Sequence, residues 1–334
     1  MLRFVVRRLL QLIPILFGLS ILLFIWIRRL PGGPAVALLG ERATPERIAQ
    51  INQIYGLDQP VWVQYLKFLG RAVRGDFGVS VKTLRPVTEE WWDRFPATVE
   101  LALMAGLIAV AIGIPLGYYA ARRHGSWLDS LSVMGSLIGV AIPVFFLGYI
   151  LKYVFAVRLG WLPADGRQDP RIFTEHPTGF YVLDGFLVGR PDASWDAFLH
   201  LILPSIALAS IPLAVITRIT RASVLDVVHE DYVRTAEAKG LTTGVISRRH
   251  VLRNALLPVA TVTGLQVGLL LAGAVLTEQT FNIAGIGRFL VESIQARDYA
   301  VIQGFILIIA LIVVVVNLLV DISYGLIDPR VRVR

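Results

Sequence analysis

The sequence predicts an all-α membrane protein with six transmembrane helices, and its composition and the spacing of its apolar runs support this. Hydrophobic residues make up 55% of the 334 residues, and the mean hydropathy is +0.66. The apolar residues gather in runs of about 20, the length a helix needs to cross a bilayer core. Because lipid offers the backbone no hydrogen-bonding partner, isolated runs of this length are expected to be helical.

Six such runs follow one another along the chain. They lie at residues 9–27, 97–121, 130–157, 199–217, 255–280 and 301–324. The first run resembles a secretory signal peptide because Arg3, Arg7 and Arg8 precede it. However, it is 19 residues long and is followed directly by Arg28 and Arg29. Signal peptides have apolar regions of only about 7–15 residues, so we expect this run to be retained as a membrane span.

Basic residues are distributed unevenly between the two sides that six spans create. They concentrate in segments 1–8, 122–128, 218–253 and 325–334, and they are fewer in segments 158–198 and 281–300. Short loops rich in Lys and Arg stay in the cytoplasm. Both termini are therefore expected on the cytoplasmic side.

Composition also excludes several classes of function. A net charge of +8 in a soluble protein would suggest a nucleic-acid partner, but loops beside a membrane carry such charge routinely, so none is expected. The absence of cysteine excludes disulfides and thiolate metal sites, and the five histidines lack ligand spacing. The chain has no Gly-x-x-x-x-Gly-Lys phosphate loop and no catalytic motif, so it is not expected to be an enzyme or to contain catalytic or metal-binding residues.

Two long segments are expected on the outer side, residues 28–96 and 158–198. The first contains the amphipathic stretch Tyr55–Arg74, which predicts either a helix on the outer surface or a belt of aromatic residues at the lipid headgroups. The second is rich in Gly, Pro and Asp, which predicts an irregular outer loop.

Proline and glycine residues within the spans predict bends and close helix packing. The prolines are Pro14, Pro115, Pro143, Pro204, Pro212 and Pro258. Proline removes a helical hydrogen bond and bends the axis. The spacing Gly113-x-x-x-Gly117 is typical of helices that approach one another closely. Together these residues predict a bundle with hinges.

A few polar residues fall within or at the ends of the spans. The ionisable ones are Glu100, Lys152, Glu278 and Asp321, and the uncharged Gln266 and Asn317 lie deeper. Such groups usually face a cavity or a partner, so Glu100, Gln266, Glu278 and Asn317 are the candidates for lining a translocation path. No pair has the spacing of a proton relay. An ion-coupled secondary transporter remains the alternative from another class.

The polar segment 231–258, between two apolar runs, is the most informative part of the chain. Tyr232–Lys239 predicts two helical turns, with Gly240 at the position after the helix where a left-handed residue is favoured. Thr242-Thr243-Gly244 predicts a turn, and a second, basic helix is expected from about Ser247. Such a segment is either an ordinary basic loop or a rigid element to which another protein docks.

This segment resembles the cytoplasmic EAA loop of bacterial ABC transporter permeases, in the form of the dipeptide/oligopeptide and nickel importer family. It contains Tyr-Val-Arg-Thr-Ala-Glu-Ala-Lys-Gly-Leu and then Arg-His-Val-Leu-Arg-Asn-Ala-Leu-Leu-Pro. Arg234, Thr235 and Ala236 stand where the general pattern has Glu-Ala-Ala. The resemblance extends to Leu30–Pro34, Tyr55–Pro60, Gly75–Ser80, Phe95–Leu101, Gly160–Pro163, Glu278–Gly287, Arg297–Tyr299 and Asp328–Arg330, with Ala284 replacing a usual proline.

The resemblance implies the fold of a type I ABC importer permease, a multi-pass protein of the bacterial plasma membrane. Residues 1–94 would form the first transmembrane helix and an extracytoplasmic segment. Residues 95–324 would form the permease core with five helices and the coupling loop 218–254. Residues 325–334 would form a basic cytoplasmic tail.

The resemblance also implies a function, the import of dipeptides or oligopeptides by alternating access, with nickel or glutathione as alternative substrates. The implied partners are a homologous second permease, one or two ATPase subunits and an extracytoplasmic peptide-binding protein. Magnesium ATP would be used by the ATPases, and this chain would bind no cofactor. The residues implied to contact the ATPase are Arg234, Thr235, Ala236, Glu237, Ala238, Lys239, Gly240 and Leu241.

Overall fold

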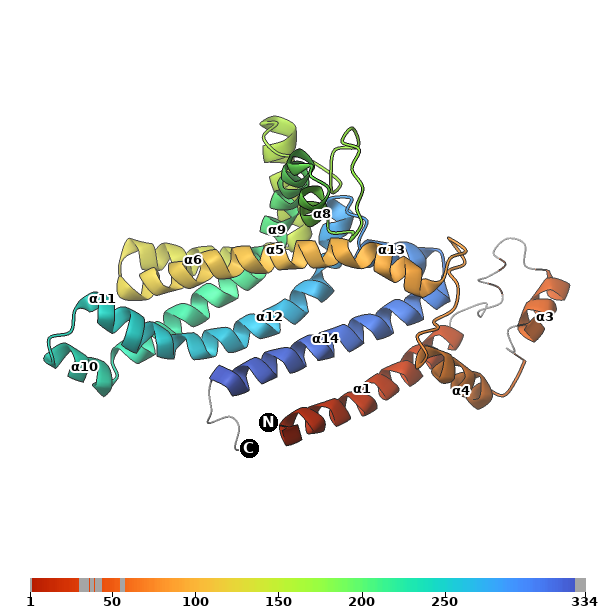
Figure 1. Cartoon of the computed structure of the whole chain (residues 1–334), viewed down its shortest axis with the longest axis horizontal. Helices are drawn as coiled ribbons and strands as arrows, with labels where there is room; N and C mark the ends of the chain where they lie inside the picture. Colours follow the sequence, from red (N-terminus) through yellow and green to blue (C-terminus); the bar gives the residue numbers. More distant parts are fainter. Residues whose placement is uncertain (1, 30–35, 37–38, 40–43, 55–57, 328–334) are drawn as a thin grey trace. The chain divides into compact units, whose positions relative to one another are not determined.

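The computed structural model describes residues 2–29, 36, 39, 44–54 and 58–327, and the elements found there are helices (Figure 1), as the sequence predicts. The motif segments Leu30–Pro34 and Asp328–Arg330, the first part of Tyr55–Pro60 and most of the basic tail lie outside the described residues.

The chain first forms α1 (Leu2–Arg29), α3 (Pro45–Ile54), α4 (Val61–Ala72), α5 (Val87–Arg122), α6 (Trp127–Ala141), α7 (Val144–Leu151) and the π-helix η2 (Lys152–Arg158). It continues with α8 (Tyr181–Leu187), α9 (Pro191–Val228), α10 (Asp231–Ala238), α11 (Thr243–Val245), the π-helix η3 (Ile246–Leu252), α12 (Arg253–Thr280), α13 (Ile286–Gln295) and α14 (Tyr299–Ile327). The helices form two compact units. Among the described residues, one holds Ala97–Ile283 and Val316–Ile327, and the other lies within Leu2–Pro96 and Ala284–Val315.

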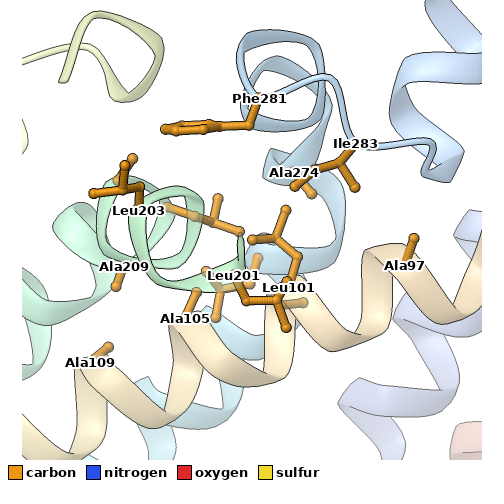
Figure 2. Close-up of a cluster of buried hydrophobic side chains, with 14 of the residues drawn as sticks. Ala97, Leu101, Ala105, Ala109, Leu201, Leu203, Ala209, Ala274, Phe281 and Ile283 are labelled. Carbon is orange, nitrogen blue, oxygen red and sulfur yellow. The ribbon is translucent and has the colours of Figure 1, made fainter. Parts of the chain in front are cut away.

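The core of the first unit is a cluster of small and branched apolar side chains on α5, α9 and α12. Ala97, Ala105 and Ala109 line one face of α5 and are fully buried against α9 residues such as Leu203. Figure 2 shows this face together with Phe281, which follows the end of α12. Alanines at these positions let the helix axes lie close together, and burial of the larger partners supplies the hydrophobic stabilisation.

The close approach predicted from Gly113-x-x-x-Gly117 is confirmed. A Cβ atom at Gly113 would lie 3.0 Å from Cγ2 of Ile216. At Gly117 it would lie 2.5 Å from the carbonyl oxygen of Thr217. Only glycine fits at residue 117, because the contacting atom belongs to the helix backbone and cannot move aside as a flexible side chain could.

The span predicted at 130–157 is not one continuous helix, and this corrects the sequence prediction. Helices α6 and α7–η2 meet at an angle of 103°. Ile142 is extended (ψ 124°) and Pro143 lacks an amide hydrogen, so the helical hydrogen bonding stops there. Among the described residues, three helices are long and apolar enough to cross a membrane, or up to five if each of two bent helix pairs is one span.

The segment 158–198, predicted to be irregular, contains a helix. Helix α8 covers Tyr181–Leu187, and α9 begins at Pro191. A Cβ atom at Gly185 would lie 2.4 Å from Oγ of Ser194, so α8 packs tightly on the first turn of α9. Glycine lies inside this helix because the close contact with α9 leaves no room for a side chain at residue 185. Figure 1 shows α8 and α10 at opposite ends of α9.

The second unit is held together by aromatic side chains. Trp91 packs edge-on against Phe305, with ring centroids 5.1 Å apart. The amphipathic stretch predicted at Tyr55–Arg74 forms α4, whose Phe68 packs on Phe24 of α1. A buried hydrogen bond of 2.6 Å from the Ser80 hydroxyl to the Asp298 carboxylate adds a polar contact.

Candidate functional site

Helix α10 begins and ends where its local chemistry requires. Asp231 places negative charge in the first turn, where the helix dipole favours it. At the other end, the amide of Gly240 donates to the Glu237 carbonyl (2.9 Å) and the amide of Leu241 donates to the Ala236 carbonyl (3.3 Å). This is a Schellman motif, and Gly240 has the left-handed φ of +76° that it requires. The predicted helix and its glycine stop are both confirmed.

One face of α10 is buried against the ends of longer helices. Val233 is 1% exposed and Ala236 is 4% exposed. They share a cluster with residues of α5, α9, η3 and α12, namely Ala121, Val224, Ile246, Val251 and Ala255. The Asn254 side-chain amide also donates to the Tyr232 hydroxyl at 3.0 Å. A force applied to α10 therefore acts directly on the ends of several helices, since packed interiors transmit strain.

The other face of α10 is exposed. Of the residues predicted to contact an ATPase, only Ala236 is buried, and the exposed ones are Arg234, Thr235, Glu237, Ala238, Lys239, Gly240 and Leu241. Arg234 lies 3.8 Å from Asp231 in an exposed ion pair that holds neither side chain firmly. This face offers charges of both signs and the apolar Leu241.

An ion pair missed by the sequence analysis joins α6 to α9 near this site. The Arg221 guanidinium donates from Nε to Asp129 Oδ1 (2.5 Å) and from Nη2 to Asp129 Oδ2 (2.8 Å). The Gly125 amide also donates to Oδ2 of Asp129 at 3.0 Å. The planar two-bond geometry fixes both side chains and so fixes the turn between α5 and α6.

The helix that follows α10 begins earlier than predicted. Of the predicted turn Thr242-Thr243-Gly244, only Thr242 lies before the helix, whereas Thr243 and Gly244 lie in its first turn. The helix continues through η3 into α12, where Pro258 lies inside it. The predicted start near Ser247 is therefore wrong by about one helical turn.

The four candidates for a translocation path lie on α5, α12 and α14. Glu100 accepts hydrogen bonds from Arg167 Nη2 (2.6 Å) and from the Val182 amide (2.9 Å), so it fastens the outer segment to α5. Glu278 is fully buried and accepts a hydrogen bond of 2.6 Å from the Thr98 hydroxyl. Gln266 is buried in α12, and Asn317 is half-buried in α14.

Lys152, which the sequence analysis placed at the end of a span, has a partner in the structure. Its Nζ donates to Asp165 Oδ1 at 2.5 Å and to the Thr280 carbonyl at 3.4 Å. The Gly166 amide donates to the Phe281 carbonyl at 2.9 Å. These bonds attach the start of the outer segment to the end of α12, where an ammonium group also suits the negative end of the helix dipole.

Beside the Glu100–Arg167 pair lies an aromatic stack. The His176 ring stacks on Tyr181, with centroids 3.5 Å apart, and Arg167 lies over the same Tyr181 ring at 3.7 Å. Nδ1 of His176 is 4.0 Å from Oδ2 of Asp184, which is fully buried. Burial lowers the pKa of His176 below its ordinary value of 6.5, and this outweighs the effect of Asp184. The imidazole is therefore neutral at pH 7.

Comparison with known proteins agrees with this geometry. Residues 113–333 match the family described as binding-protein-dependent transport system inner membrane component, and residues 1–102 match its N-terminal counterpart. The dipeptide transport system permease protein DppB of Alkalihalophilus pseudofirmus is 47% identical over 99% of this chain and 100% of its own length. DppB of Escherichia coli is 46% identical over 99% of both chains, and the glutathione transport system permease protein GsiC of the same organism is 41% identical over 99% of both.

The chain therefore belongs to the inner membrane components of binding-protein-dependent transport systems, and it is a transport subunit, not an ATPase. Proteins of this class are permeases of the inner membrane that depend on a binding protein. This establishes the family, the localisation and the type of function predicted from the sequence.

Proposed function

We propose that this chain is one of two homologous permeases in an ATP-driven dipeptide importer, and that α10 receives the movement of the ATPase subunits. The observation that carries the proposal is the division of α10 into two faces. Val233 and Ala236 fix the helix to the ends of its neighbours, while Arg234, Glu237 and Lys239 remain exposed for a partner.

The relatives favour dipeptides as the substrate. Two permeases named for dipeptide transport are 46–47% identical to this chain, whereas one named for glutathione transport is 41% identical over an equal share. Glutathione and nickel remain the alternatives within the same kind of importer.

The proposed topology has six spans with both termini in the cytoplasm. The spans are α1, α5, the bent pair α6 and α7–η2, α9, α12 and α14. Helix α9 supports this arrangement, because its 38 residues extend over roughly 57 Å and end at α8 on one side and α10 on the other. If α9 crosses the bilayer, α8 and α10 lie on opposite sides of it, and the basic residues of segment 218–253 favour the cytoplasmic side for α10.

The proposed cycle is alternating access. One or two ATPase subunits using magnesium ATP would bind the α10 helices of both permeases, and an extracytoplasmic peptide-binding protein would deliver the peptide. Coupling requires that the ATP-bound and ATP-free ATPases contact α10 differently, since equal contacts shift no equilibrium. Gln266 and Asn317 are proposed to line the path, whereas Glu100 and Glu278 are proposed to hold α5 in place through their own partners.

The absence of cysteine makes single-cysteine probes unambiguous. In membranes that contain the cognate subunits, Thr235→Cys should cross-link to an ATPase and be shielded from an impermeant maleimide added outside. Phe186→Cys, on the exposed part of α8, should react from outside and form no such cross-link. Reaction of Thr235→Cys from outside would overturn the topology.

Uptake by reconstituted proteoliposomes tests the transport step. With binding protein and ATPases present, labelled dipeptide should enter only when ATP is supplied, and an ionophore should leave the rate unchanged. Glutathione and nickel serve as competitors. Uptake driven by an imposed ion gradient without ATP would favour the secondary transporter, and better competition by glutathione than by dipeptide would reassign the substrate.

A further inference from the structure

A cavity of about 460 Å³ lies between α5 and the segment Thr243–Leu252. Its apolar lining includes Ile114, Pro115 and Leu252. Tyr118 and Tyr119 also line it. The volume is within the range of pockets that hold small molecules, and an apolar wall with a few polar groups is typical of such pockets.

The cavity has one basic lining residue, Arg248, and a second, Arg122, contacts its lining. Arg248 lines it and is exposed, and Arg122 donates to the hydroxyl of Ser247, another lining residue, at 3.5 Å. No carboxylate is among the described residues of its lining. Guanidinium groups bind phosphate with two parallel hydrogen bonds, so the cavity is complementary to an anionic phosphate ester.

The surface beside the cavity is apolar. Ile112, Pro115 and Tyr119 are exposed and lie three and four residues apart, so they form one stripe along α5. This helix is one of the three that are long and apolar enough to cross a membrane. The stripe ends at the two tyrosines, a residue type enriched at the level of lipid headgroups.

We propose that this cavity binds one anionic glycerophospholipid of the inner leaflet. Its phosphate would lie at Arg248 and Arg122, its glycerol between the tyrosines and an acyl chain along the α5 stripe. Basic pockets between membrane helices on the cytoplasmic side are suited to such headgroups. Charge complementarity favours this occupant over a zwitterionic lipid, and the apolar stripe favours a lipid over a free phosphate. The site does not depend on which substrate is transported.

Native mass spectrometry of the full chain in mild detergent measures the binding directly. Phosphatidylglycerol should be retained at a stoichiometry of one, and phosphatidylcholine should be lost at the same activation energy. Arg248→Gln should weaken retention of phosphatidylglycerol at least about tenfold, since a hydrogen bond to a charged group is removed. Arg249→Gln is the matched control, because Arg249 is exposed, adjacent and outside the cavity lining, and it should leave retention unchanged.

A second variant tests the cavity without changing charge. A Cβ atom at Gly244 meets no other atom within 4 Å, so Gly244→Leu should fold and fill part of the cavity. It should also weaken phosphatidylglycerol binding, and glycerol phosphate should fail to displace the lipid from the unmodified chain.

Three results would overturn the proposal. The first is unchanged phosphatidylglycerol retention in both Arg248→Gln and Gly244→Leu. The second is equal retention of phosphatidylcholine by the unmodified chain. The third is displacement by glycerol phosphate, which would mean that the acyl chain contributes nothing.

Discussion

Replacing Gly240 by valine tests whether α10 must keep its left-handed end. Gly240 has a φ of +76°, and a Cβ atom there would meet no other atom within 4 Å. The cost of the substitution therefore comes from the backbone alone. An L-residue in this conformation costs about 1–2 kcal/mol, and a β-branched side chain is among the least suited to it.

That cost is enough to change the population of the turn. A difference of 1–2 kcal/mol is a factor of about 5–30 in an equilibrium constant. Losing the turn breaks the hydrogen bonds from Gly240 to Glu237 and from Leu241 to Ala236, and so frees the end of α10 from its Schellman motif. Gly240→Asn should have a smaller effect, because asparagine tolerates left-handed conformations.

The assay is dipeptide uptake and ATP hydrolysis in the same proteoliposomes with the cognate subunits. Gly240→Val should lower the amount of peptide transported per ATP about 5–30-fold, and Gly240→Asn should lie between it and the unmodified chain. Gly189→Val is the matched control, because Gly189 has a φ of +72° and equal free space but lies beside α8. An unchanged ratio of transport to hydrolysis in Gly240→Val would refute the role assigned to this turn.

Three further predictions concern the first unit. Asp129→Asn should lower the free energy of unfolding by about 2 kcal/mol. This is less than the roughly 3–5 kcal/mol expected for a fully buried ion pair, because Arg221 is 23% exposed. The double variant Asp129→Arg with Arg221→Asp, which reverses the pair, should recover part of the melting temperature lost when the pair is broken. Gly117→Ala should lower the free energy of unfolding by about 1–3 kcal/mol, because its Cβ atom would clash with Thr217. Gly135→Ala is the control and should leave the melting temperature unchanged, because a Cβ atom there meets no other atom within 4 Å. Because the pKa of His176 is lowered on folding, its contribution to stability is complete above pH 6.5 and is lost as the pH falls through the folded pKa. His176→Phe, which keeps the stack on Tyr181, should reduce the fall in melting temperature between pH 7.5 and 5.5, and an unchanged pH dependence would contradict this.

Local chemistry made α10 predictable from the sequence. Its first turn, its length and its end depend on residues within about one turn of each other, and Gly240 marks the end by itself. The buried face was not predicted, since Ala236 was expected to contact the ATPase, whereas the structure buries it beside Val233, three residues away on the same side of the helix. The partners that bury this face come from helices far away in the sequence, and no local pattern identifies them.

The pair of Asp129 and Arg221 shows what sequence reasoning missed. The two residues are 92 positions apart, and Asp129 lies between the predicted loop 122–128 and the span predicted to start at residue 130, so the sequence analysis did not single it out. The bend at Pro143 was also underestimated. Proline accounts for a break, but the angle depends on packing elsewhere, such as Gly148, where a Cβ atom would lie 3.0 Å from the Phe281 ring.

Helix α9 can connect events at the two ends of the first unit. Its C-terminal end shares the cluster around Val224 with α10, and its first turn is fixed to α8 by the tight contact of Ser194 with Gly185. Pro204 and Pro212 are both buried inside it, and each removes one backbone hydrogen bond from the helix. Bending is therefore easiest in the helical turn that precedes each proline. A displacement of α10 would then reach the outer segment as a change of bend in α9, which agrees with the coupling proposed for α10.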